Sequence, residues 1–364
     1  MNYSEQLQKL REQQLYRERV VRTSKVGRYV SINGTQLLNF NCNDYLDLSA
    51  HPALIIAATN ASQKLGFGST GSPLMSGYTS LHQELEFAMA SFLGYDKAVL
   101  FSTGYMANLG IAQALLNKDD VLIEDKLNHA SLIDGTLLAR AQLKRYPHLN
   151  YDKAEEALQL KEDKNALLAT DGIFSMDGDS PDLNEIIQVC KKNKINLIVD
   201  EAHAVGVFGK RGVGLIQKLE LENDVFARLI TFGKAMGCHG AAILCNENLK
   251  QYLINFSRSF IYTTALPPHS LASIHSAYTE LISTKNKTQL HKNIAYFKAE
   301  IIKQNLQKNF IKSDSAIHCC IISGNEQVKQ IAKKLQQHNF NVKPILSPTV
   351  KKDEERLRFC LHSY

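Results

Sequence analysis

The sequence has few of the features that tie a chain to disulfides, structural zinc or a membrane. Its seven cysteines are odd in number, and no two of them form a Cys-x-x-Cys pair. This pattern argues against a disulfide framework or a structural zinc site and favours a reducing cytoplasm. Residues 1–20 are polar and charged, without the apolar segment of a signal peptide, and no apolar run approaches the length of a transmembrane helix. We therefore expect a cytoplasmic protein that does not bind a membrane.

The charge of the chain is also too small to identify a partner. A net charge of +6, from 42 basic and 36 acidic residues, does not demand nucleic acid and is equally compatible with an acidic substrate or an acidic carrier protein. The length of 364 residues suggests about two domains. A hydrophobic content of 44% is ordinary for a globular protein with a substantial core.

Short apolar runs alternate with helical patterns through the middle of the chain. Strands separated by helices predict a mostly parallel α/β sheet that is covered on both faces. The expected strands are 98–101, 120–123, 166–169, 196–199, 229–231 and 242–244.

Three segments are expected along the chain. Residues 1–40 predict a charged helix over 3–19 and two strands, 28–32 and 36–40, turned by Asn33-Gly34. Residues 41–270 would form the large α/β domain. Residues 271–364 would form a small α+β domain, with a long helix over 270–304 and strands near 317–322 and 356–361.

An aspartate and a lysine carry the main chemical signal. Asp200 ends the buried run 195–199, and Lys234 follows in Thr231-Phe232-Gly233-Lys234 without a charged neighbour. A partly desolvated lysine downstream of an acid at the carboxyl end of a strand is typical of pyridoxal phosphate (PLP) chemistry. The lysine forms a Schiff base with the aldehyde, and the aspartate keeps the pyridinium nitrogen protonated.

Other residues complete a site for this cofactor. The strand-to-helix turn at 102–106, with Gly104, offers backbone N–H groups and a helix N-terminus to a phosphate, although such a turn also occurs without a ligand. Thr231 could add a hydroxyl to the same phosphate. His203 lies within reach of the cofactor's phenolic oxygen, and His129 could stack on its ring; each histidine alone is more often structural.

Two familiar motifs occur in a sequence context that argues against their usual functions. Residues 66–71 match the dinucleotide fingerprint, but they follow a helical pattern over 53–65 where a strand is required. Residues 200–203 spell a helicase-type acidic box without the upstream phosphate loop of a nucleotide-driven motor. No pair of ligands at helical metal spacing has a convincing third member, so we expect no metal.

Motifs along nearly the whole chain resemble the α-oxoamine synthases, a family of fold-type I PLP enzymes. The matching stretches are 43–46, 76–78 with His82, 127–131, 172–179, 199–203, 231–234 and 262–264 with Pro267-Pro268. The resemblance implies a mostly parallel seven-stranded-type sheet and a small C-terminal domain. It also implies a homodimer that joins an amino acid to an acyl thioester with loss of carbon dioxide.

The resemblance also implies a role for each matching residue. Lys234, His129 and Asp200 would be catalytic, with His129 stacked on the ring. The residues implied to contact the cofactor are Gly104, Tyr105, Ser175, Asp200, His203, Thr231 and Lys234, joined by Thr264 reaching the phosphate of the neighbouring subunit. Arg17, His129 and Thr349 would contact substrate.

Within the family, residues 240–245 and 179–183 are most similar to the branch that serves biotin synthesis. That branch condenses L-alanine with a pimeloyl thioester, on acyl carrier protein or coenzyme A, to 8-amino-7-oxononanoate. The 2-amino-3-ketobutyrate ligases, aminolevulinate synthases and serine palmitoyltransferases are alternatives, as is a degraded paralogue that binds PLP without catalysis.

The sequence departs from the family pattern at three places. Thr70 stands where a glycine is usual, and Pro73 follows it. Residues 346–351 lack an arginine and a second proline. The chain stops at Tyr364, where relatives usually continue into a final helix, and we expect an incomplete C-terminal domain with an exposed apolar face.

Overall fold

The computed structural model describes residues 2–13, 15–159 and 164–364. These residues form three sheets, of which the largest has seven strands. Its order is β3 (Lys97–Phe101), β9 (Ala241–Cys245), β8 (Ala227–Thr231), β7 (Asn196–Asp200), β6 (Ala166–Asp171), β4 (Val121–Asp125) and β5 (Gln142–Tyr146). Strand β9 pairs antiparallel with both β3 and β8, while the pairs from β8 to β5 are parallel. The predicted mostly parallel α/β sheet is confirmed.

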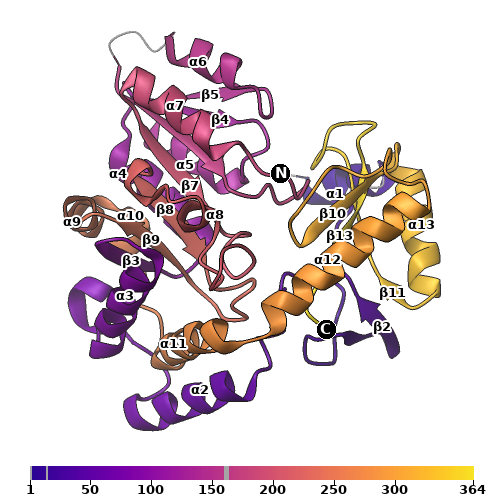
Figure 1. Ribbon diagram of the computed structural model, residues 1–364, viewed down its shortest axis with the longest axis horizontal. Helices are drawn as coiled ribbons and strands as arrows, with labels where there is room; N and C mark the ends of the chain where they lie inside the picture. The colour runs from indigo at the N-terminus through magenta and orange to yellow at the C-terminus, as the bar shows by residue number, and fades with distance from the viewer. Residues whose placement is uncertain (1, 14, 160–163) are drawn as a thin grey trace.

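Helices cover both faces of this sheet because successive strand residues point to opposite sides. Leu100, Ile123 and Val199 pack into one core with helices α3 (Ser80–Leu93), α7 (Leu183–Asn193) and α11 (Pro268–Ser283). Val99, Leu122 and Ile198 pack into the other core with α4 (Gly104–Leu115), α5 (Ala130–Ala139) and α9 (Glu247–Phe256). Figure 1 shows these layers around the sheet. The remaining helical elements of this part are α2 (Pro52–Leu65), η1 (Pro73–Gly77), α6 (Tyr151–Gln159), α8 (Leu215–Lys218), η2 (Glu222–Asp224) and α10 (Arg258–Ile261).

The six strands expected in the central region are all present, with bounds that differ by up to two residues. Strand β5 was not expected. It is an edge strand of sequence QLKRY, largely uncovered except at Tyr146, so it carries neither an apolar run nor a clean alternation.

The two ends of the chain meet in the small domain. Strands β1 (Tyr29–Ile32) and β2 (Thr35–Asn39) form the expected hairpin, and Asn33 and Gly34 take the positive φ angles that a tight two-residue turn requires. Strand β2 also pairs with β11 (Phe340–Asn341) near the other end of the chain. A third sheet contains β10 (Ile317–Ile321), β13 (Arg356–Cys360) and β12 (Lys343–Ile345), beside helix α13 (Asn325–Gln337). The boundaries at residues 40 and 270 stay predictions.

Two expected helices are shorter than predicted. Helix α1 (Tyr3–Glu12) ends well before residue 19, and residue 14 of the expected helix lies outside the described residues. None of the residues of α1 is buried, so packing does not extend the helix. The expected helix over 270–304 is two helices, α11 and α12 (Asn286–Lys303), which run from the large domain to the small one in Figure 1. It breaks at Thr284, which is extended and accepts a hydrogen bond from Asn286 N at 3.1 Å.

The segment that resembles a dinucleotide fingerprint follows a helix, α2, as expected from the sequence. Thr70 has a φ of 55°, a left-handed conformation that suits glycine and is rare for a β-branched residue. The family's usual glycine at this position therefore has a conformational reason.

Among the described helices, none is long and apolar enough to cross a membrane.

Candidate active site

A cavity of about 330 Å³ lies at the carboxyl ends of the parallel strands, where α/β sheets usually bind their ligands. Its volume is within the range of small-molecule sites, about 300–1,000 Å³. The lining residues are Gly104, Tyr105, Asn108, His129, Asp171, Ile173, Ser175, Asp200, Ala202, His203, Thr231 and Lys234. The structure thus brings together eight predicted site residues from five separate stretches of the sequence. A second hollow, of about 350 Å³, lies at the other edge of the sheet and contains three acidic residues but no lysine or histidine.

Lys234 lies in the loop after β8, and its Nζ is 2.8 Å from His203 Nε2. Burial lowers the pKa of Lys234 to about 8, although the negative charges of Asp200 and Asp171 oppose this change. Burial also lowers the pKa of His203 far below its ordinary value, and the Lys234 charge adds to the effect. A neutral imidazole therefore lies beside an amine that is partly unprotonated near neutral pH.

Tyr45 fixes the other side of the His203 ring. Its hydroxyl is 2.7 Å from His203 Nδ1, and both side chains are buried. Tyr45 belongs to a stretch that resembles the family, but nothing in its spacing pointed to His203. The pair of contacts, one at each ring nitrogen, holds the imidazole in place.

Asp200 ends strand β7 and is only 7% exposed. Its Oδ1 accepts a hydrogen bond from Ala202 N at 2.9 Å, and its Oδ2 accepts one from Asn108 Nδ2 at 2.8 Å. Two N–H donors stabilise the ionised form of a buried carboxylate. Asn108 was not predicted, although it lies one helical turn after Gly104 and so faces the same way as that residue.

Asn108 also connects Asp200 to His129. Asn108 Nδ2 donates to Ser131 Oγ at 2.9 Å, and Ser131 Oγ is 2.7 Å from His129 Nδ1. His129 is the N-cap of α5 and stays exposed at the cavity. A chain of hydrogen bonds therefore connects Asp200 with His129, two of the predicted catalytic residues.

Helix α4 begins at Gly104, beside Thr231. Thr103 caps the helix by accepting a hydrogen bond from Met106 N at 3.1 Å. A Cβ added at Gly104 would lie 3.8 Å from the Thr231 side chain and so would occupy the space between them. The Thr231 hydroxyl donates to Gly240 O at 3.0 Å. A helix N-terminus that lines a cavity in this way suits a phosphate group.

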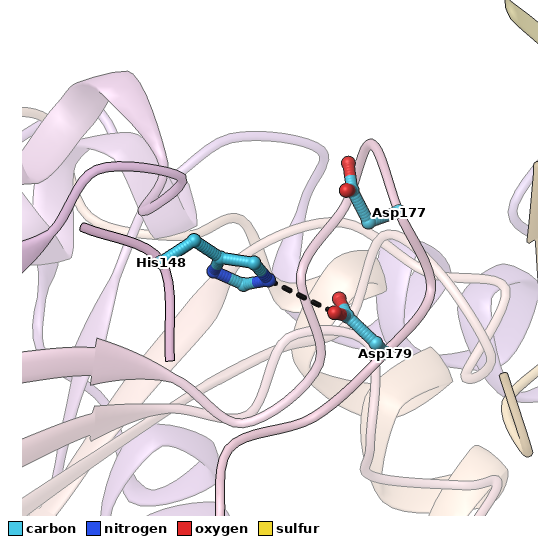
Figure 2. Close-up of side chains that lie close together, drawn as sticks. All are labelled: His148, Asp177 and Asp179. Carbon is cyan, nitrogen blue, oxygen red and sulfur yellow. Dashed lines mark hydrogen bonds and ion pairs between the residues drawn. The ribbon is translucent and has the colours of Figure 1, made fainter. Parts of the chain in front are cut away.

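The loop that carries Ser175 is held by charged residues on both sides. Asp177 pairs with Arg356 Nη1 of strand β13 at 2.6 Å. Asp179 Oδ2 lies 2.9 Å from His148 Nε2. Figure 2 marks this contact with a dashed line. Gly178 has a φ of 85°, and a Cβ there would lie 2.1 Å from Ile317 O, so only glycine fits between the loop and the small domain.

The three residues in Figure 2 are the one group of possible metal ligands in the described part of the chain. Both nitrogens of His148 are already occupied, because Nδ1 is 2.9 Å from Asp125 Oδ1. Burial lowers the pKa of His148, but hydrogen bonds to Asp125 and Asp179 outweigh it and raise this pKa to about 10. A protonated imidazole has no lone pair for a metal. We read this group as an ion cluster that positions the Ser175 loop.

Arg358 is a further charged residue that the sequence did not point to. It lies on β13, where its Nε donates to Ser175 O at 2.7 Å and its Nη2 donates to Asn43 Oδ1 at 3.2 Å. Its positive charge helps to lower the pKa of both Lys234 and His203. Arg358 therefore lies close to the cavity, although a β-strand in the small domain carries it.

Three predicted residues lie apart from this cavity. Arg17 is exposed after α1, and Thr349 is exposed in the loop after β12. Thr264 is exposed beside a small hollow that Tyr78 and Leu266 also line. Their roles as substrate contacts and as a contact to a neighbouring subunit stay predictions.

The cavity fits pyridoxal phosphate on the chemistry of its residues. An amine with a lowered pKa can link to the aldehyde, a fixed carboxylate can pair with the pyridinium nitrogen, and a helix N-terminus can bind the phosphate. These three features lie on separate elements, and all of them line the one cavity.

Comparison with known proteins supports this reading. The family model for aminotransferase class I and II matches residues 35–363. The 8-amino-7-oxononanoate synthase of Methylobacillus flagellatus is 38% identical over 349 residues, which cover 95% of this chain and 87% of that protein.

Solved structures show the fold-type I transferase fold. A serine palmitoyltransferase from S. paucimobilis with bound PLP–myriocin has a TM-score of 0.92 and 26% identity, covering 99% of this chain and 92% of that one. An 8-amino-7-oxononanoate synthase from Francisella tularensis has a TM-score of 0.79 and 33% identity, covering 90% and 92%.

Proposed function

The chain belongs to the class I and II aminotransferase family, and from this premise we propose that it condenses L-alanine with a pimeloyl thioester. The products are 8-amino-7-oxononanoate, carbon dioxide and free thiol, in the synthesis of biotin. The cavity that gathers Lys234, Asp200, His203 and His129 carries this proposal. The names of relatives that are 36–39% identical over nearly the whole chain support the choice of reaction.

The structure of the product determines the two substrates. A nine-carbon acid with a ketone at carbon 7 and an amine at carbon 8 can be divided between these two carbons. The first seven carbons come from a pimeloyl group, whose thioester carbonyl becomes the ketone. The remaining two carbons and the nitrogen come from alanine after its carboxylate leaves as carbon dioxide.

Bound PLP supplies an aldehyde that links to an amine and a ring that accepts electrons from a carbon losing its proton or carboxylate. Lys234 would hold the cofactor through its amine, and the same amine, when free, would be the base that takes the α-proton of alanine. A pKa of about 8 suits this second role because a useful fraction of the amine is unprotonated near neutral pH. The neutral His203 at 2.8 Å keeps the amine in position without adding a positive charge.

Asp200 would pair with the protonated ring nitrogen of the cofactor. Its two N–H donors, Ala202 and Asn108, fix the orientation of its carboxylate. His129 lies at the open side of the cavity, where its imidazole can stack on the ring and contact the incoming thioester. Gly104, Tyr105 and the hydroxyl of Thr231 form the phosphate end of the site.

Arg358 is the candidate partner for the carboxylate of alanine. Its positive charge helps to lower the pKa of Lys234 and of His203. Its hydrogen bonds to Ser175 O and Asn43 Oδ1 fix the guanidinium group. Arg17 and Thr349 stay proposed contacts to substrate. Thr264 stays a proposed contact from the neighbouring subunit of a homodimer.

Condensation with serine is a second candidate, because serine palmitoyltransferases give TM-scores of 0.92 and 0.93. Their sequence identity of 26–28% is lower than that of the 8-amino-7-oxononanoate synthases, and we therefore place alanine first. Acyl carrier protein is a possible carrier for the pimeloyl group. The seven cysteines are all free, which suits the cytoplasm that we propose as the location.

The test is product analysis by mass spectrometry. The protein would be incubated with PLP, a pimeloyl thioester on coenzyme A or on acyl carrier protein, and alanine, glycine or serine in parallel. We expect an alanine-dependent product with the mass of 8-amino-7-oxononanoate. A product with glycine or serine alone would move the chain to another branch, and no product with any amino acid would contradict the proposed reaction.

A further inference from the structure

A second buried carboxylate lines the cavity beside Asp200. Asp171 ends strand β6, is only 3% exposed, and is the register partner of Asp200 on the neighbouring strand β7. Paired residues on neighbouring parallel strands point to the same side of a sheet. Both side chains accordingly line the cavity, and two ionised carboxylates this close would repel each other strongly.

Hydrogen bonds distinguish the two acids. Asp200 accepts N–H groups at 2.8 and 2.9 Å, one at each carboxylate oxygen. The side chain of Asp171 accepts one backbone N–H, from His129, at the long distance of 3.5 Å. Short N–H donors favour the ionised form, so the environment stabilises a charge on Asp200 far better than on Asp171.

The other groups around Asp171 do not reverse this difference. Burial raises the pKa of Asp171 well above its ordinary value, and the Asp200 charge raises it further. Glu124 on β4 also raises the pKa of Asp171, while the Lys234 charge and the hydrogen bond from the His129 amide lower it. Glu124 itself is buried, which raises its pKa to about 7.

We propose that Asp171 works in this site as a neutral carboxylic acid, which donates a hydrogen bond into the cavity and leaves Asp200 as its one ionised carboxylate. The bound partner would be an oxygen of the cofactor or of the substrate. With Asp171 neutral, the two acids carry a single negative charge. That charge would balance one cation, the protonated ring nitrogen, without an excess of negative charge.

Neutral Asp171 also has a consequence for Lys234. A negative charge on Asp171 stabilises the ammonium form, since it acts to raise the pKa of Lys234. While Asp171 keeps its proton, the amine is more readily unprotonated. Ionisation of Asp171 at high pH would raise the pKa of Lys234 and make it a poorer source of free amine.

The protonation state can be measured on the full-length protein without cofactor, by infrared difference spectroscopy at neutral pH. The wild type minus Asp171→Asn difference should contain the band of a protonated carboxyl group. Glu124→Gln is the matched control, because it removes a different buried acid and should leave the Asp171 band in place. A difference that contains only ionised carboxylate bands would overturn the proposal.

Asp200→Asn gives a second measurement that does not need Asp171 to be replaced. Without the neighbouring charge, the pKa of Asp171 should fall by about one to three pH units, and its carboxyl band should titrate away at lower pH. An unchanged titration would contradict the pairing of the two acids. Circular dichroism on each variant checks that the fold is intact.

The role in turnover rests on the proposed function, whereas the infrared result does not, so the two can fail separately. With PLP, alanine and a pimeloyl thioester, Asp171→Asn should keep turnover within about tenfold of wild type, against the 10²- to 10⁴-fold loss that follows removal of a proton-transfer group. Turnover of the variant should also persist to higher pH. A loss as large as that of a proton-transfer group would mean that the ionised form of Asp171 is the working one. An unchanged loss of activity at high pH would contradict the effect of Asp171 on Lys234.

Discussion

His203 and His148 are both largely buried at the carboxyl edge of the same sheet, yet their surroundings act on them in opposite ways. His203 contacts an amine and a phenol, and its pKa lies far below the ordinary value. His148 contacts two carboxylates, and its pKa is raised to about 10. One histidine is neutral beside a reactive lysine, and the other is a cation that holds a loop.

The difference distinguishes residues that take part in chemistry from residues that stabilise the structure. In the cavity, Lys234 has no carboxylate within ion-pair distance in the described structure, and its hydrogen bond goes to a neutral ring. In the His148 cluster, each charged group has an opposite charge within 3 Å. Shifted pKa values cluster at active sites, but networks of structural ion pairs shift pKa values too. The ion pairs around His148 therefore assign its shift to a structural role.

Replacement of Lys234 should have the largest effect. Lys234→Ala removes both the covalent anchor of the cofactor and the base, so we expect turnover to fall about 10⁴-fold or more. Alanine-dependent product formation, followed by mass spectrometry, measures the loss. Lys250→Ala is a matched control, because Lys250 is also largely buried but pairs with Glu86 at 2.7 Å, outside the cavity. Comparable losses in both variants would remove the distinction.

Replacement of His148 should change stability more than turnover. We expect His148→Gln to lower the free energy of unfolding by about 1.5–3 kcal/mol, the range for hydrogen bonds to charged groups. The folded-state pKa is raised, so this stability is fully present below the unfolded pKa of about 6.5 and is lost as pH rises through about 10.

Thermal melts of wild type and His148→Gln between pH 6 and 10 would follow this trend. The difference in Tm should be largest at the acidic end and should shrink toward pH 10. A difference that grows with pH would show that His148 is neutral in the folded protein.

The smallest effect is expected at Tyr45. Tyr45→Phe removes the hydroxyl at 2.7 Å from His203 Nδ1, and we expect a loss of about 1 kcal/mol in transition-state stabilisation, or roughly fivefold in kcat/KM. Tyr146→Phe is a control at another buried tyrosine, which lies on strand β5. Equal kinetic effects of the two changes would mean that the contact with His203 has no role of its own.

Much of the fold and of the cavity could be predicted from local signals. Buried strands leave apolar runs, and Asp200 and Lys234 follow such runs directly. Strand β5 was missed because an edge strand needs no apolar run. Asp171 follows a predicted strand as Asp200 does, but the prediction of that strand stopped two residues short of it.

The remaining residues depend on contacts that are distant in sequence. Arg358 reaches the cavity region only because β13 of the small domain packs against the loop that carries Ser175. Asn108 gains its role from partners that lie 23 and 92 residues away. The spacing of residues along the chain does not predict such contacts, and the structure is needed to find them.

Chemical mapping of the cofactor linkage tests the account most directly. The protein would be loaded with PLP, reduced with borohydride, digested, and analysed by peptide mass spectrometry. We predict that the reduced cofactor is attached to the peptide that contains Lys234, and that Lys234→Ala carries no label at any site above background. Specific labelling of another lysine, with Lys234 unmodified, would contradict the assignment of this cavity as the active site.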